Sequence, residues 1–130
     1  MAKLLIVEDD DALRNGLEEV LSQVYKHEVR AMKSAQAALG AIEAAVPDLV
    51  ISDVRMPAMS GPQLLSAVRA QPKWEGIPFL FISASIVEEM ERQIAAPEGV
   101  FFLRKPFEIE TLQEVVVAAL VASSRKVRQS

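Results

Sequence analysis

Residues 47–61 read PDLVISDVRMPAMSG. A mainly apolar run, residues 48–52, ends at Asp53 and is followed by a segment that contains proline and glycine. A short run of aliphatic and β-branched residues bounded by turn formers predicts a buried strand. Asp53 is therefore expected at the carboxyl end of a strand, where the chain enters a loop.

Similar runs recur on both sides of this strand, and helix-like stretches separate them. The other predicted strands are residues 4–7, 27–32, 79–82 and 100–103. Apolar periodicity and capping residues predict helices at 11–24, 34–45, 60–70, 87–95 and 108–123. This alternation predicts one doubly wound α/β domain, in which helices cover both faces of a parallel sheet.

Composition excludes several other classes of protein. The chain has 130 residues, a net charge of −4 and no cysteine. This length fits one domain. The net negative charge does not indicate a nucleic-acid-binding protein, and without cysteine a thiolate metal site is impossible. The first residues do not resemble a signal peptide, and the longest apolar run, residues 115–122, is too short to span a bilayer. We expect a cytoplasmic domain over residues 1–122, followed by a basic tail or linker, residues 123–130, that frays.

Polar side chains follow four of the predicted strands. Glu8 and Asp9 follow the first strand, Asp53 the third, Ser83 the fourth and Lys105 the fifth. The carboxyl ends of parallel strands meet at one edge of the sheet, which is where ligands bind. Carboxylates gathered there repel one another unless a cation neutralises them, and Mg²⁺ prefers oxygen ligands. The set predicts a magnesium-dependent site in which Asp53 accepts a phosphoryl group.

Each of these residues also has a common structural explanation. An aspartate after a strand often starts a turn, a serine often caps a loop, and a lysine is usually a solvated surface group. Asp10 and Asp11 are expected to cap the first helix and to interact with its dipole, without binding a cation. The ordered combination favours a functional site over these separate explanations.

Together these fragments resemble the receiver domain of two-component response regulators, over residues 3–122. The segments DVRMPAMSGPQLL and KPFEIETL carry the resemblance, together with the spacing of 22 residues between Ser83 and Lys105. The resemblance implies a CheY-like, flavodoxin-like (βα)5 domain whose five parallel strands have the order 2-1-3-4-5.

The resemblance also implies a role for each residue of the site. Asp53 would be the phosphoacceptor, and Mg²⁺ would be held by Glu8, Asp9, Asp53 and the backbone carbonyl of Arg55. The residues that would engage or respond to the phosphoryl group are Ser83, Ala84, Lys105 and Phe102. Phe102 has no hydroxyl group, so any switch there would work by packing alone. Arg55 and Ser85 flank the site at positions that tune the lifetime of the phosphoryl group in the family.

The implied partners are a histidine kinase or a histidine phosphotransfer protein, which would donate the phosphoryl group. An output partner or a fused domain would bind the face formed by the fourth helix, the fifth strand and the fifth helix. The resemblance implies no direct binding to nucleic acid or membrane, and either a monomer or a phosphorylation-dependent dimer. The protein would be a switch and not an enzyme, apart from self-phosphotransfer and autodephosphorylation.

Two alternatives to this hypothesis remain open. The first is a degenerate receiver that binds its partners without being phosphorylated. The second is a Mg²⁺-dependent phosphohydrolase, which is disfavoured because such enzymes usually carry a second acid two residues after the nucleophile, where this chain has Arg55. The sequence also leaves open whether the chain is a single-domain regulator or part of a longer one.

Overall fold

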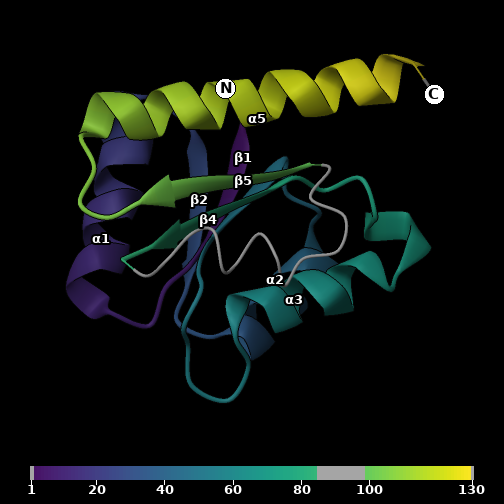
Figure 1. The fold of residues 1–130 in the computed structure, drawn as a ribbon, viewed down its shortest axis with the longest axis horizontal. Coiled ribbons are helices and arrows are strands. Elements are labelled where there is room, and N and C mark those ends of the chain that lie inside the picture. Colours follow the sequence, from purple (N-terminus) through teal and green to yellow (C-terminus); the bar gives the residue numbers. More distant parts are fainter. Residues whose placement is uncertain (1, 85–98, 130) are drawn as a thin grey trace.

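A computed structural model of the protein describes the backbone of residues 2–84 and 99–129 and the side chains as far as residue 122. Ser85 and the helix expected at 87–95 lie outside these residues. The described strands form one parallel sheet in the order β2-β1-β3-β4-β5, which confirms the expected topology (Figure 1). The strands are β1 (Lys3–Val7), β2 (Glu28–Met32), β3 (Leu49–Asp53), β4 (Phe79–Ser83) and β5 (Val100–Arg104).

Three of the described helices begin directly after the capping residues that the sequence predicted. The described helices are α1 (Asp11–Glu19) with a π-helical end η1 (Val20–Val24), α2 (Ala35–Ala44), α3 (Gly61–Arg69), the 3₁₀ turn η2 (Pro72–Trp74) and α5 (Ile109–Gln129). Asp10 and Ser34 each accept a backbone N–H of the first turn, and Ser60 forms a capping box with Gln63. Among the described residues, no helix combines the length and the apolar content needed to cross a bilayer.

One boundary differs from the prediction. Helix α5 continues to Gln129, whereas the sequence pattern predicts that the helix ends near residue 123 and that the tail, residues 123–130, frays. The tail contains arginine, lysine and glutamine, which are good helix formers, and it has no proline or glycine that would stop a helix. Polarity of the tail is therefore compatible with continued helix.

The sheet separates two hydrophobic clusters, one on each face. The cluster on the side of α2 and α3 contains Ala38, Leu64, Val68, Phe79 and Phe81, among others. The cluster on the side of α1 and α5 contains Leu4, Ile6, Leu17, Leu112 and Val116, among others. Because successive side chains of a strand point to opposite faces, each strand contributes to both clusters. The strands are therefore covered on both sides, as their nearly continuous apolar sequences predicted.

The register of the strands sets the position of the site. Val7 pairs with Ser52, and Asp53 pairs with Ile82. Glu8 follows Val7 and Asp53 follows Ser52, so these two acids lie side by side at the ends of adjacent strands. Ser83 pairs with Arg104, so Lys105 leaves the sheet beside the end of β4. Parallel pairing thus brings together side chains that are far apart in the sequence.

Candidate functional site

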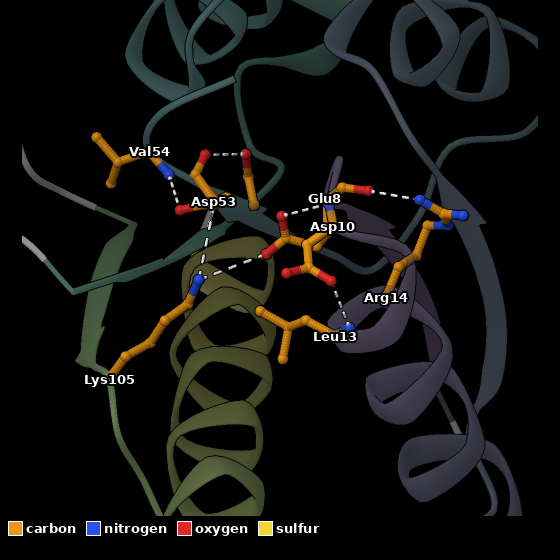
Figure 2. Close-up of polar contacts among 8 residues, drawn as sticks. Glu8, Asp10, Leu13, Arg14, Asp53, Val54 and Lys105 are labelled. Atoms are coloured by element: carbon orange, nitrogen blue, oxygen red, sulfur yellow. Dashed lines mark hydrogen bonds and ion pairs between the residues drawn. The ribbon is translucent and has the colours of Figure 1, made fainter. Parts of the chain in front are cut away.

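Three carboxylates converge at the carboxyl edge of the sheet. Oxygen atoms of Glu8, Asp9 and Asp53 lie within 4.8 Å of one another. Glu8 is only 2% exposed, which is unusual for a glutamate, while Asp53 is half-buried and Asp9 is exposed. The Nζ atom of Lys105 lies 3.5 Å from Glu8 Oε1 and 3.6 Å from Asp53 Oδ2. Figure 2 shows this lysine reaching between the two acids.

The cluster holds an excess of negative charge. Burial raises the pKa of the Glu8 carboxyl group from 4.5 to about 7. The backbone N–H of Asp10 and the charge of Lys105 oppose this rise in pKa, and the negative charge of Asp53 adds to it. A set of oxygen ligands with excess negative charge fits a hard divalent cation such as Mg²⁺, which keeps several of its waters.

The backbone around Asp53 is tightly fixed. The Asp53 side chain accepts a hydrogen bond from the N–H of Val54 at 2.8 Å, and the Ser52 hydroxyl donates to the Asp53 carbonyl at 2.7 Å. Gly61 lies so close that a Cβ atom there would collide with the Asp53 carbonyl oxygen and would lie 2.8 Å from Phe81 Cε1. Glycine is therefore required where the loop after β3 folds back onto the strand.

The predicted phosphoryl-responsive residues occupy the ends of β4 and β5. Ser83 is buried at the end of β4, and Ala84 beside it is exposed. The backbone N–H of Lys105 donates to the Ser83 carbonyl at 2.9 Å, and the bond between Lys105 and Pro106 is cis. Phe102 is half-buried, and its ring centroid lies 6.0 Å from that of Phe81.

Two predicted residues remain, Arg55 and Ser85. Arg55 lies in the loop two residues after Asp53 and is exposed. Ser85 lies outside the described residues. The structure therefore brings Glu8, Asp9, Asp53 and Lys105 together, and it places Ser83 at the same edge.

Sequence reasoning missed Arg14. One guanidinium nitrogen donates to the backbone carbonyl of Glu8 at 3.0 Å, and the other contacts Asp11 at 2.5 Å. The spacing of three between Asp11 and Arg14 is a recognisable signal for a pair on one helix face. Nothing in that spacing indicates the contact between Arg14 and the Glu8 carbonyl, which lies at the end of β1.

Comparison with known proteins places the chain in a family. The family model of the response regulator receiver domain matches residues 4–117. Over 115 residues, the chain is 38% identical to the response regulator protein FleR of Pseudomonas aeruginosa, covering 88% of this chain and 24% of FleR. The chain thus spans about a quarter of that relative.

Solved structures agree with this match. The chemotaxis protein CheY4 of Vibrio cholerae is 32% identical, with a TM-score of 0.84, and the match covers 92% of this chain and 98% of CheY4. A signal receiver domain of a histidine kinase from Syntrophus aciditrophicus is 26% identical, with a TM-score of 0.81, and the match covers 93% and 91%. The fold, the acidic edge and these matches lead to one conclusion: the chain belongs to the response regulator receiver domain family.

Proposed function

We propose that the protein is a phosphorylation-controlled switch of two-component signalling, in which Asp53 accepts a phosphoryl group from a phosphohistidine. One observation carries this proposal. Glu8, Asp9 and Asp53 present oxygen atoms within 4.8 Å of one another, and Lys105 lies 3.6 Å from Asp53. That arrangement supplies a nucleophile, ligands for a divalent cation and a positive charge at one point.

The chemistry of the transfer follows from these groups. A carboxylate oxygen of Asp53 attacks the phosphorus atom, the P–N bond breaks, and the imidazole nitrogen keeps the bonding electron pair. The product is an acyl phosphate, which water later hydrolyses. Lys105 stabilises negative charge on the transferring oxygens. Glu8, Asp9, Asp53 and the Arg55 carbonyl would hold Mg²⁺, which when bound neutralises charge on the phosphoryl oxygens.

The response of the protein would involve the ends of β4 and β5. Ser83, Ala84 and Lys105 would bind the phosphoryl oxygens, and the packing of Phe102 would change with them. Such a ligand shifts a conformational equilibrium by the difference in its contacts with the two states. Arg55 and Ser85 would influence how fast water reaches the acyl phosphate.

The partners follow from the same proposal. The protein would act in the cytoplasm, where a histidine kinase or a histidine phosphotransfer protein would present the phosphohistidine. The output partner, or a domain fused to this one, would bind the face that includes β5 and α5. The protein would act as a monomer or as a phosphorylation-dependent dimer.

Intact-mass measurement after incubation with a small-molecule phosphodonor and Mg²⁺ tests the proposal. We expect a single phosphoryl adduct on the wild type, and no adduct on Asp53→Ala or in the presence of EDTA. Asp48→Ala is the matched control, because Asp48 is an exposed acid at the other end of β3 whose side chain accepts the N–H of Lys3. This control should be phosphorylated like the wild type.

A wild type that folds and binds Mg²⁺ but gains no adduct would overturn the proposal. The degenerate receiver, which binds partners without phosphorylation, would then be the better description. An adduct that survives Asp53→Ala would assign the acceptor to another residue.

A further inference from the structure

We propose that Arg14 is a positioning residue for the cation site, which sorts the acidic run 8–11 into carboxylates that face the cation and carboxylates that do not. The inference rests on the proposed function, since it concerns the same Mg²⁺ site. The hydrogen bonds of Arg14 go to the Glu8 carbonyl and to Asp11, which are not reacting atoms. It acts through the backbone of Glu8 and through the side chain of Asp11.

The contacts of Arg14 join the strand to the helix that follows it. Its Nη1 atom donates to the Glu8 carbonyl at 3.0 Å, and its Nη2 atom donates to Asp11 Oδ1 at 2.5 Å. The Arg14 side chain is only 15% exposed, whereas that of Asp11 is 80% exposed, so the contact with the Glu8 carbonyl is better shielded from water than the ion pair. Hydrogen bonds from a charged donor are stronger than neutral ones. Figure 2 shows the guanidinium reaching from α1 to the end of β1.

The four consecutive acids of this run have different partners. Asp10 Oδ1 accepts the Leu13 N–H at 3.1 Å as the helix cap, and Asp11 pairs with Arg14. Glu8 and Asp9 are the two acids of the run that gather with Asp53. Two carboxylates are thus engaged by α1 itself, and the other two are directed to the site.

Geometry explains why this position needs an arginine. The peptide unit is planar, so holding the Glu8 carbonyl also fixes the orientation of the bond that leads to Asp9. Asp9 is exposed, so burial does not hold its side chain in place. A guanidinium has donors that point in two directions from a rigid plane, whereas an ammonium is a single point charge. Arg14 can therefore hold the carbonyl and Asp11 at the same time.

Charge and positioning make opposite predictions for the loss of Arg14. If Arg14 acted only as a nearby positive charge, its removal would make the site more negative and would tighten the binding of Mg²⁺. If Arg14 positions the ligands, its removal would weaken Mg²⁺ binding, because groups that hydrogen-bond to the residues around a metal keep the metal ligands in the right orientation. The sign of the change in Mg²⁺ affinity separates these two roles.

The experiment is a calorimetric titration with Mg²⁺ alone, at fixed pH and ionic strength, on the full chain. We expect Arg14→Met to bind Mg²⁺ roughly tenfold more weakly than the wild type. Arg14→Lys should recover part of this loss, because an ammonium can reach one of the two partners but not both. Urea denaturation without Mg²⁺ reports the stability of each variant separately.

Arg30→Met is the matched control. The Arg30 guanidinium likewise donates to two oxygen atoms, in this case the backbone carbonyls of Ala41 at 2.7 Å and Ala45 at 2.6 Å, at the end of α2. The control removes the same charge and the same kind of contact without touching the acidic run. We expect it to lose stability and to keep its Mg²⁺ affinity.

Affinity for Mg²⁺ in Arg14→Met that equals or exceeds that of the wild type would overturn the inference, and so would an equal loss in Arg30→Met. If Arg14→Met does not fold, Arg14→Lys decides: binding as tight as in the wild type overturns the inference, and weaker binding supports it. A wild type that binds no Mg²⁺ would overturn the proposed function itself. Normal Mg²⁺ binding and phosphorylation with no effect of Arg14 would overturn only this inference.

Discussion

The two ends of the parallel sheet treat their charged side chains in opposite ways. At the carboxyl end, three acids gather, and Lys105 contacts two of them at distances of 3.5 and 3.6 Å. At the amino end, Asp48 accepts the N–H of Lys3 at 2.8 Å, and the Arg69 guanidinium donates to the Ile77 carbonyl at 2.6 Å. These two charged groups at the amino end are each hydrogen-bonded to the backbone, whereas the acids gathered at the carboxyl end outnumber the lysine that contacts them.

Because of this difference, we expect the carboxyl end to be the less stable end of the domain when no cation is bound. A buried carboxylate beside another one disfavours the folded state unless a cation is present. A charged group that donates to a backbone carbonyl stabilises the folded state instead. We therefore expect changes at the carboxyl end to alter stability and Mg²⁺ binding together, and changes at the amino end to alter stability alone.

The largest effect is expected from Gly61→Ala, at the carboxyl end. The new Cβ atom would collide with the Asp53 carbonyl and would press on the Phe81 ring, so the loop must shift. We expect a loss of about 3 kcal/mol in the free energy of unfolding, measured by urea denaturation, together with weaker Mg²⁺ binding. Gly76→Ala is the control, because a Cβ at Gly76 has nothing within 4 Å. Equal effects of the two substitutions would refute this account.

Glu8→Gln should change stability in the opposite direction. Burial raises the pKa of Glu8 to about 7, so the ionised carboxylate opposes folding above that pH. Without Mg²⁺ at pH 8, we expect the substitution to stabilise the protein by roughly 2 kcal/mol. The same substitution removes a ligand and should weaken Mg²⁺ binding. Glu43→Gln, an exposed glutamate paired with Lys73, is the matched control.

The raised pKa of Glu8 also predicts how stability depends on pH. Between pH 4.5 and about 7, the folded protein holds a proton on Glu8 that the unfolded chain releases. Its contribution to stability is therefore complete below pH 4.5 and is lost as the pH rises through about 7. Urea denaturation in EDTA should show this decline in the wild type and not in Glu8→Gln. Parallel pH profiles for the two proteins would contradict the assignment.

A smaller effect is expected from Arg69→Met, at the amino end. Burial lowers the pKa of Arg69, and the guanidinium also lies 5.6 Å from the centre of the Phe79 ring. Loss of its hydrogen bond to Ile77 should cost about 1.5 kcal/mol in the free energy of unfolding. Mg²⁺ affinity should stay as in the wild type, because these contacts lie at the other end of the strands. A change in Mg²⁺ affinity would show that the two ends are not independent.

Most of the fold and much of the site could be predicted because they depend on local patterns. Apolar runs predicted the strands, capping residues predicted the helix starts, and parallel pairing placed Glu8, Asp53 and Lys105 at one edge. The family resemblance supplied the strand order, which periodicity alone does not determine.

Other features depend on packing that no short stretch encodes. The burial of Glu8, and hence its raised pKa, results from the elements that close over the end of β1. The contact from Arg14 to the Glu8 carbonyl depends on the path of one long side chain. The extension of α5 to Gln129 lies in a polar segment, and polarity alone does not distinguish a helical tail from a frayed one.

Phe101 and Phe102 are neighbours on β5, yet each packs with a different hydrophobic cluster. Phe102 packs with the cluster beside α2 and α3, and Phe101 packs with the cluster beside α1 and α5. The backbone between them is one continuous strand at the border of the sheet. A slide or a tilt of β5 consequently repacks both sides of the domain in a single movement. A change in packing on one face of the sheet can therefore be transmitted to α5 through the backbone of β5, without any side chain crossing the sheet.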